Sequence, residues 1–193
     1  MVAPAGTDTR PTSDRARQAL FDMLLHAPWA GRDAIQGALV LDAFAGTGAL
    51  GLEALSRGAA AATFIECDAA ALRALRSNIA ACGPEQRCTV VAGDALHPPR
   101  GRLCDLLFLD PPYGQDLMAR ALERLAARGW VGPETLIVAE TGRDEEALGT
   151  APLLAERIYG AARISVWRAA DNPRSGSSRS CAFATRCTTR AAC

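Results

Sequence analysis

The tetrapeptide Asp110-Pro111-Pro112-Tyr113 follows an apolar run at 106–109 that is typical of a buried strand. An exocyclic amino group on a nucleic-acid base is a poor nucleophile, because its lone pair is delocalised into the ring. A catalyst must therefore hold both N–H bonds and aim the nitrogen. The Asp110 carboxylate and the Pro111 carbonyl could accept these hydrogen bonds, and Tyr113 could stack on the base. Each proline excludes helical geometry from the residue before it, so we predict a stiff catalytic loop for methyl transfer to a base amino group.

A glycine-rich loop runs from Asp42 to Gly51, between an expected buried strand and an expected helix. Gly46 and Gly48 would let the backbone pass close to a ligand, because they carry no Cβ. The spacing of these two glycines and Gly51 satisfies the dinucleotide-binding pattern, and the acidic Glu66 follows Gly46 by 20 positions. The spacing alone fits both NAD and S-adenosylmethionine.

The acidic residues around the glycines favour the second cofactor. Asp42 could face a cationic amino-acid group but would sit poorly beside a pyrophosphate. Glu66 could accept hydrogen bonds from both ribose hydroxyls, and Asp94, at the end of the next expected strand, could meet an adenine amino group. For Asp94 a cap of a helix or turn is the simpler alternative. The sequence therefore predicts an S-adenosylmethionine site.

Alternating apolar patterns supply the scaffold that must position these loops. Strands that alternate with helices predict a doubly wound parallel sheet, with a ligand crevice at the carboxyl ends of its strands. An antiparallel hairpin around Gly160 is expected at one edge. The expected helices are 13–25, with Ser13 or Asp14 near its start, 49–57, 69–81 and 115–128; the expected strands are 38–41, 62–66, 87–92, 104–109, 134–139, 153–159 and 162–167.

Composition indicates a single globular domain: the chain has 193 residues, of which 49% are hydrophobic and 22% charged. Residues 1–10 lack the apolar region of a signal peptide, and no run of about 18 uncharged apolar residues occurs, so we expect a cytoplasmic protein with no membrane segment. A monomer is the default expectation. The seven cysteines include no pair at zinc-site spacing, and neither histidine has a partner at useful spacing, so we expect neither metal nor disulfide.

The charge balance does not indicate a general polyanion binder. Formal net charge is zero, all 21 basic residues are arginines, and without residues 171–193 the chain carries 17 basic and 20 acidic residues. Nucleic-acid-binding proteins usually have a basic footprint. Such a footprint here would need arginines clustered locally or supplied by another segment.

Three segments together resemble one family: Arg10 to Arg17, the loop Leu41 to Ala59, and Phe108 to Tyr113. They are similar to the bacterial 16S ribosomal RNA (guanine-N2)-methyltransferases of the RsmD family, over about residues 5 to 168. The resemblance implies a class I S-adenosylmethionine-dependent methyltransferase fold, which is Rossmann-like α/β with a seven-stranded, mostly parallel sheet. It also implies methylation of one guanine, guanine 966, of 16S ribosomal RNA in the assembled small ribosomal subunit.

The resemblance further assigns roles to single residues. The lid of the cofactor would be Arg10, Pro11 and Thr12, and the catalytic residues would be Asp110, Pro111, Pro112 and Tyr113. Arg15 and Arg17 could touch phosphate or simply form a solvated helix face. The cofactor site would be lined by Asp42, Phe44, Gly46, Gly48, Glu66 and Asp94.

Three segments follow from this assignment: an N-terminal helix with the lid at 1–37, a methyltransferase domain at 38–168, and a disordered tail at 169–193. Family members usually carry a basic β-hairpin before the segment that corresponds to Arg10, whereas this chain starts directly at Met1-Val2-Ala3. RNA docking is therefore the part of the resemblance that the sequence leaves unexplained.

Alternatives remain open at this point. An adenine-N6 or other amino-methyltransferase acting on DNA could use the same catalytic loop, and a proline-rich turn would also explain Asp110-Pro111-Pro112 taken alone. A dehydrogenase would need a nicotinamide-site residue where this chain has that loop. A non-catalytic RNA-binding or assembly protein is the third possibility.

Overall fold

The computed structural model describes residues 11–30, 34–112, 117–145 and 152–169. Ala169, the first residue of the expected disordered tail, is instead buried, and its amide donates to the carbonyl of Thr135 at 3.0 Å. The rest of that tail, the lid residue Arg10 and the loop residue Tyr113 lie outside these ranges.

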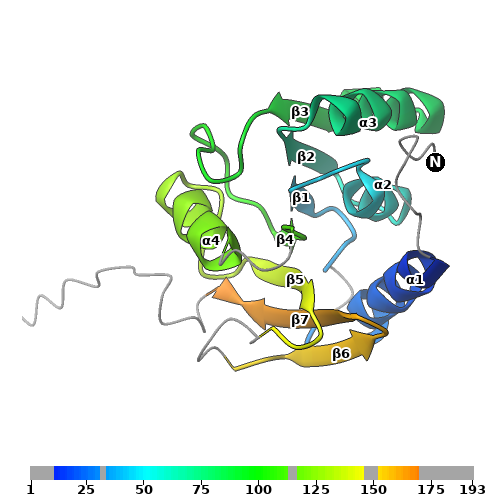
Figure 1. Cartoon of the computed structure of the whole chain (residues 1–193), viewed down its shortest axis with the longest axis vertical. Coiled ribbons are helices and arrows are strands. Elements are labelled where there is room, and N and C mark those ends of the chain that lie inside the picture. The colour runs from blue at the N-terminus through cyan, green and yellow to red at the C-terminus, as the bar shows by residue number, and fades with distance from the viewer. Residues whose placement is uncertain (1–10, 31–33, 113–116, 146–151, 170–193) are drawn as a thin grey trace, which may run out of the picture.

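One seven-stranded sheet forms the centre of the molecule, in the order β3-β2-β1-β4-β5-β7-β6 (Figure 1). Strands β1 to β5 pair in parallel, whereas β7 pairs antiparallel with both β5 and β6. This confirms the predicted parallel sheet with an antiparallel hairpin at one edge. The strands are β1 (Leu39–Ala43), β2 (Ala61–Glu66), β3 (Cys88–Ala92), β4 (Leu106–Leu109), β5 (Leu136–Gly142), β6 (Ala155–Tyr159) and β7 (Ala162–Arg168).

In the ranges that the structure describes, four α-helices accompany the sheet, all close to their predicted positions. Helix α1 begins at Pro11, earlier than the Ser13 or Asp14 start that the sequence suggested; proline suits a first helical turn, where its missing N–H has no partner to lose. Pro11 and Thr12 therefore belong to the start of a helix. The helices are α1 (Pro11–His26), α2 (Ala49–Ser56), α3 (Ala69–Cys82) and α4 (Leu117–Ala127), with a short 3-10 turn at Glu85–Arg87.

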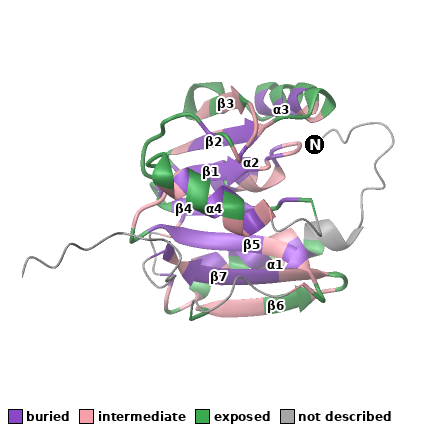
Figure 2. Cartoon of the chain, turned by 60° about the vertical axis from the view of Figure 1, so that its left-hand side comes forward, coloured by how far each residue is buried: buried purple, intermediate pink, exposed green. Residues whose placement is uncertain are grey.

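The side chains of each central strand alternate between two hydrophobic cores. In β4, Leu106 and Phe108 pack in the core beneath α1, α2 and α3, whereas Leu107 and Leu109 pack in the core beneath α4. The same alternation holds along β5. Figure 2 shows these central strands as largely buried. Whether a residue occupies an even or an odd position along these strands therefore decides which layer of helices its side chain packs against.

Helix α1 is held on the sheet by Phe21, which is fully buried. The centroid of the Phe21 ring lies 5.7 Å from the centroid of the Phe108 ring. The guanidinium carbon of Arg57 lies 5.0 Å from the centroid of the Phe21 ring, a cation–π contact. Arg57 is itself paired with Glu53 on α2, 2.6 Å away. This stack joins α1 to both α2 and β4.

Replacing Phe21 with alanine should lower the free energy of unfolding by about 3–5 kcal/mol, because it leaves a cavity under α1. Urea unfolding followed by circular dichroism measures this change. The control is Leu103→Ala, since Leu103 is 57% exposed and its loss should alter stability by less than about 0.5 kcal/mol. Equal effects of the two substitutions would contradict this account of how α1 is attached.

Candidate active site

Four acidic residues come together at the carboxyl ends of the parallel strands. Asp42 is the last but one residue of β1, Glu66 ends β2, Asp110 follows β4 and Glu140 lies near the end of β5. All four occupy even-numbered positions, in phase with the side chains that face the core under α1 and α2. The acids therefore gather on one side of the sheet.

The glycine-rich loop after β1 takes an unusual backbone path. Phe44, Gly46 and Gly48 have φ angles of 67°, 54° and 82°, in the left-handed region. That region is costly for a residue with a side chain such as Phe44, and strain of this kind is concentrated at functional sites. A Cβ on Gly46 would meet nothing within 4 Å, whereas a Cβ on Gly48 would collide with the side chain of Leu75. Gly46 borders open space, and Gly48 is needed for packing.

Asp42 is buried, with 2% of its surface exposed. Its Oδ2 accepts a hydrogen bond from the Gly51 amide at 2.9 Å and so caps the first turn of α2. Burial raises the pKa of Asp42 to about 8; the bond from Gly51 opposes this shift, and the charges of Asp110 and Glu66 add to it. Asp42 therefore ties the glycine loop to α2, a role that the sequence did not suggest.

Glu66 is fixed by three backbone N–H donors. Oε2 accepts from Gly46 at 2.7 Å, and Oε1 accepts from Cys67 at 2.8 Å and from Asp68 at 2.7 Å. A carboxylate offers about four acceptor positions, so one remains for a ligand at the edge of the glycine loop. The side chain is oriented before any ligand arrives.

Asp94 lies in the turn that follows β3. Its Oδ1 accepts from the Leu96 amide at 2.8 Å, and its Oδ2 lies 2.9 Å from Nδ1 of His97. The Leu96 hydrogen bond, with help from His97, holds the pKa of Asp94 below its ordinary value. These are the contacts of a turn cap, as in the simpler alternative for this residue, and they keep the carboxylate ionised.

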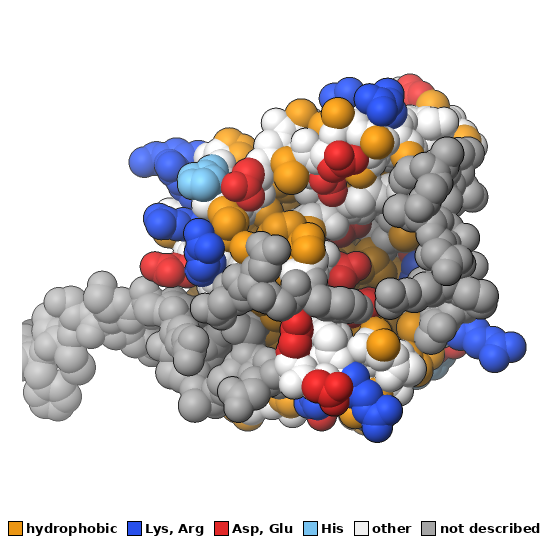
Figure 3. Space-filling view, in the orientation of Figure 1, with side chains coloured by type: hydrophobic (Ala, Val, Ile, Leu, Met, Phe, Trp, Pro, Cys, Tyr) orange, Lys and Arg blue, Asp and Glu red, His pale blue; other side chains and the backbone are white. Residues whose placement is uncertain are grey.

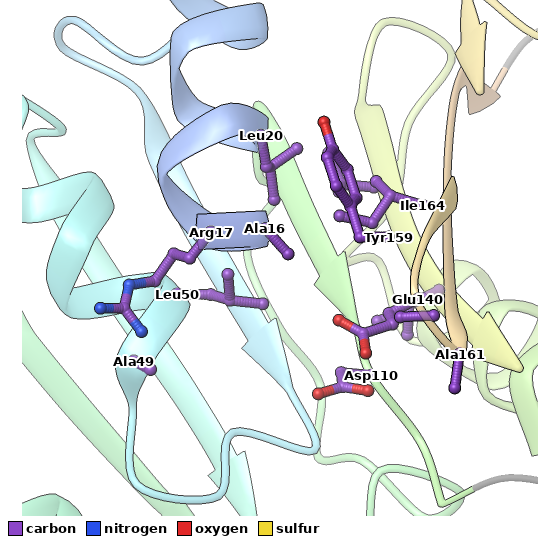
Figure 4. Close-up of a pocket in the computed structure, with 13 residues that line it drawn as sticks. Ala16, Arg17, Leu20, Ala49, Leu50, Asp110, Glu140, Tyr159, Ala161 and Ile164 are labelled. Carbon is purple, nitrogen blue, oxygen red and sulfur yellow. The ribbon is translucent and has the colours of Figure 1, made fainter. Parts of the chain in front are cut away.

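A cavity of about 200 Å³ opens beside Asp110. Figure 4 shows the carboxylates of Asp110 and Glu140 close together at its lower end. The apolar walls come from α1, α2 and the β6–β7 hairpin. They include Leu20, Leu50, Tyr159 and Ile164.

The Asp110 carboxylate faces this open space, yet enough protein surrounds it for desolvation to matter. Burial, followed by the negative charge of Glu140, raises the pKa of Asp110 to about 7. Pro111 is buried behind it and Pro112 is exposed. A carboxylate that titrates near neutral pH is typical of functional sites.

Glu140 and Tyr159 were not singled out from the sequence. Glu140 had a detectable signal, because an acid that ends the apolar run Leu136–Ala139 matches the pattern of Asp42 and Asp110. Tyr159 had none, since only the return of the β6–β7 hairpin brings it to the cavity. Of the arginines expected near phosphate, Arg15 is exposed and Arg17 lines the cavity.

Within the described ranges, no three His, Cys, Asp or Glu side chains are grouped so as to hold a metal ion. Cys67, Cys82, Cys88 and Cys104 are free thiols. Among the helices that the structure describes, none is long and apolar enough to cross a membrane.

Comparison with known proteins connects this geometry to a family. The family model described as conserved hypothetical protein 95 matches residues 1–168. Ribosomal RNA small subunit methyltransferase D of Escherichia coli strain K12 is 40% identical over 154 residues, which cover 79% of this chain and 73% of that protein.

Solved structures agree with this match. The Escherichia coli protein yhhF, solved as a candidate methyltransferase, has a TM-score of 0.69 at 36% identity and covers 82% of this chain and 86% of its own. An RNA methyltransferase of Salinibacter ruber, solved with S-adenosyl-L-homocysteine, has a TM-score of 0.60 at 15% identity over 84% of this chain and 93% of its own, which shows a shared fold.

The predicted class I methyltransferase fold is thus confirmed, and S-adenosylmethionine is the cofactor that this fold serves. The chain belongs to the family described as conserved hypothetical protein 95, the family of the ribosomal RNA small subunit methyltransferase D proteins.

Proposed function

We propose that this protein methylates the N2 amino group of one guanine in 16S ribosomal RNA, as a monomer acting on the assembled small ribosomal subunit in the cytoplasm. The observation that carries the proposal is the pair of carboxylates, Asp110 and Glu140, in one cavity with apolar walls. The resemblance to the family points to guanine 966 as the target.

Guanine fits two adjacent acceptors better than adenine does. The Watson–Crick edge of guanine presents the N2 amino group beside the N1–H donor, whereas the adenine amino group lies beside the N1 acceptor. Leu109 and Ala139 are paired across β4 and β5, so Asp110 and Glu140 follow as neighbours on adjacent strands. In this proposal Asp110 accepts from N2–H and Glu140 accepts from N1–H. A carboxylate opposite the N1 lone pair of adenine would be repelled.

Asp110 has the central part in the proposed chemistry. Its carboxylate and the carbonyl of Pro111 hold the amino group so that the nitrogen lone pair points at the methyl carbon. When bound, S-adenosylmethionine supplies a methyl group activated by its sulfonium. The new N–C bond leaves a proton on the amino nitrogen, and Asp110, with its pKa of about 7, can take that proton. Tyr113 is proposed to stack on the base.

The residues at the glycine loop fit this cofactor. The open space over Gly46 leaves room for a ligand against the backbone, and the remaining acceptor position of Glu66 is on Oε2, the oxygen that the Gly46 amide contacts. We propose that Glu66 binds the ribose hydroxyls and that Asp94 meets the adenine amino group. Phe44 and Gly48 would shape the loop, Asp42 would hold it, and Arg10, Pro11 and Thr12 would cover the site.

The first test measures methyl transfer from radiolabelled S-adenosylmethionine to unmodified small ribosomal subunits, naked 16S RNA and duplex DNA. Label on guanine N2 in the subunits is expected, and Asp110→Ala should reduce it at least about 100-fold while cofactor affinity is retained. Asp144→Ala, at an exposed acid, is the matched control and should keep full activity. Label on DNA alone would indicate an adenine enzyme, and undiminished label in Asp110→Ala would refute the mechanism.

The second test concerns Glu140 and pH. Because Asp110 must be ionised to accept the hydrogen bond, kcat/KM should fall as the pH drops below about 7. Glu140→Gln removes a negative neighbour, which lowers the pKa of Asp110 and should move this fall to lower pH. Glu134→Gln, at an exposed acid, should leave the profile in place.

Base selectivity gives Glu140 a second readout. RNA with 2-aminopurine at the target keeps the amino group but lacks N1–H, so the native enzyme should methylate it poorly. The side-chain amide introduced by Glu140→Gln can donate to N1 of 2-aminopurine. This variant should therefore show a smaller difference between the methylation rates of the guanine RNA and the 2-aminopurine RNA. An unchanged pH profile together with unchanged selectivity would contradict the role proposed for Glu140.

The third test concerns Asp42. Because its pKa is raised to about 8 in the folded state, from 3.8, Asp42 makes no unfavourable contribution to stability below about pH 4, and its ionisation destabilises the fold increasingly as the pH rises towards 8. Asp42→Asn keeps an acceptor for Gly51 but removes the charge, so it should be more stable than the native protein at pH 9 by more than about 1 kcal/mol. Urea unfolding at pH 5 and pH 9 measures this, with Asp144→Asn as control. If the free energy of unfolding changed equally with pH in Asp42→Asn and in the native protein, ionisation of Asp42 would not destabilise the fold, and the prediction would be wrong.

A further inference from the structure

Five exposed arginines lie on α4 and on the segment 94–103 beside it. We call this surface the arginine ridge. Figure 3 shows basic side chains gathered around a histidine over these elements. The ridge consists of Arg100, Arg102, Arg120, Arg124 and Arg128, all exposed.

Helix geometry aligns three of these residues. Arg120, Arg124 and Arg128 are spaced four residues apart; the first two lie within α4 and Arg128 lies just beyond its end. Met118, Ala121, Leu122 and Leu125 of the same helix are buried against the sheet. The outer surface of α4 is therefore basic. Glu123 is the single acid within this helix.

The segment 94–103 adds the other two arginines to the same surface. The Gly101 amide donates to the carbonyl of Arg128 at 3.0 Å, and the Trp130 indole N–H donates to the carbonyl of Pro99 at 2.9 Å. These bonds fix the segment beside the C-terminal end of α4. Arg100 and Arg102, which flank Gly101, therefore lie next to Arg128.

The ridge arginines differ from those that stabilise the fold. Arg57 and Arg163 bind carboxylates, and Arg87 donates to the carbonyls of Leu55 and Ala59. Within the described part of the chain, no hydrogen bond or ion pair occupies the side chains of the ridge arginines, although the charge of Arg120 helps to lower the pKa of Asp94. Five solvated guanidinium groups on one surface serve no evident structural purpose and suit phosphate oxygens well.

The position of the ridge relates it to the active site. Helix α4 begins at Leu117, shortly after the catalytic loop, and the segment 94–103 leaves the carboxyl end of β3, so both elements start at the edge of the sheet where the acids gather. Along α4 the ridge extends from Arg120, near this edge, to Arg128 at the other end of the helix, so an RNA strand with one base in the cavity beside Asp110 would have to follow the helix to contact all of it.

We infer that the arginine ridge binds the phosphate backbone of the RNA substrate. This inference rests on the proposed function, because it takes RNA as the partner. It also explains how a chain with zero net charge can bind a polyanion: five arginines are concentrated on α4 and the segment 94–103, although Asp94, a proposed cofactor residue, begins that segment.

The test compares two double variants of the full chain. Arg124→Gln/Arg128→Gln removes two ridge charges, and Arg73→Gln/Arg76→Gln removes two exposed charges from α3, in the helical layer that packs with the other core. Binding to labelled, unmodified 16S RNA is measured by filter retention at several salt concentrations, with S-adenosylhomocysteine present. Methyl transfer to the same RNA and to small subunits is measured in parallel.

The ridge variant should bind several-fold more weakly, and the slope of log affinity against log salt should fall by about 1 to 2, whereas the α3 variant should match the native protein. A native slope and affinity in the ridge variant would overturn the inference while native methyl transfer leaves the proposed function standing. A native protein that neither binds nor methylates RNA would overturn both. If both double variants bound RNA equally more weakly than the native protein, the binding would reflect general electrostatic attraction. That result would also overturn the inference that the arginine ridge binds RNA.

Discussion

The alternation of side chains along the parallel strands is the constraint on which this molecule depends. Successive residues of β1, β4 and β5 enter different cores, so acids in phase at the strand ends must emerge on the same side. Asp42, Asp110 and Glu140 meet there for this reason. A shift of one residue in the register of β4 would turn Asp110 towards α4 and away from Glu140.

Gathering acids in this way is electrostatically unfavourable, and the surrounding structure offsets it in different ways. Glu66 and Asp94 receive backbone N–H donors, and the donor to Asp94 holds its pKa below the ordinary value. Asp42 and Asp110 are desolvated and near other acids, so protons bind them more readily. The site thus combines carboxylates that are held by backbone N–H donors at its proposed cofactor end with a titratable group where we propose that proton transfer occurs.

The separation of charge across the molecule follows from the same architecture. Helices α1 and α2 cover the acidic side of the sheet with apolar residues and enclose the cavity. Helix α4 covers the other side, and its outer surface carries the arginines. A net charge of zero therefore conceals a local concentration of exposed arginines, and this is why composition alone gave no indication of a nucleic-acid partner.

Local patterns in the sequence were sufficient to predict the alternating strands and helices, the glycine loop and the position of Asp110, because period-two and period-3.6 patterns and backbone restrictions act over a few residues. Strand β5 extends three residues beyond its predicted end because it pairs with β7 as far as Gly142, a contact between distant segments. The cap of Asp42 on Gly51, the approach of Tyr159 to Glu140 and the alignment of Arg100 with Arg128 also depend on which segments pack together. Only the tertiary structure decides these features, because they arise from contacts that no local pattern encodes.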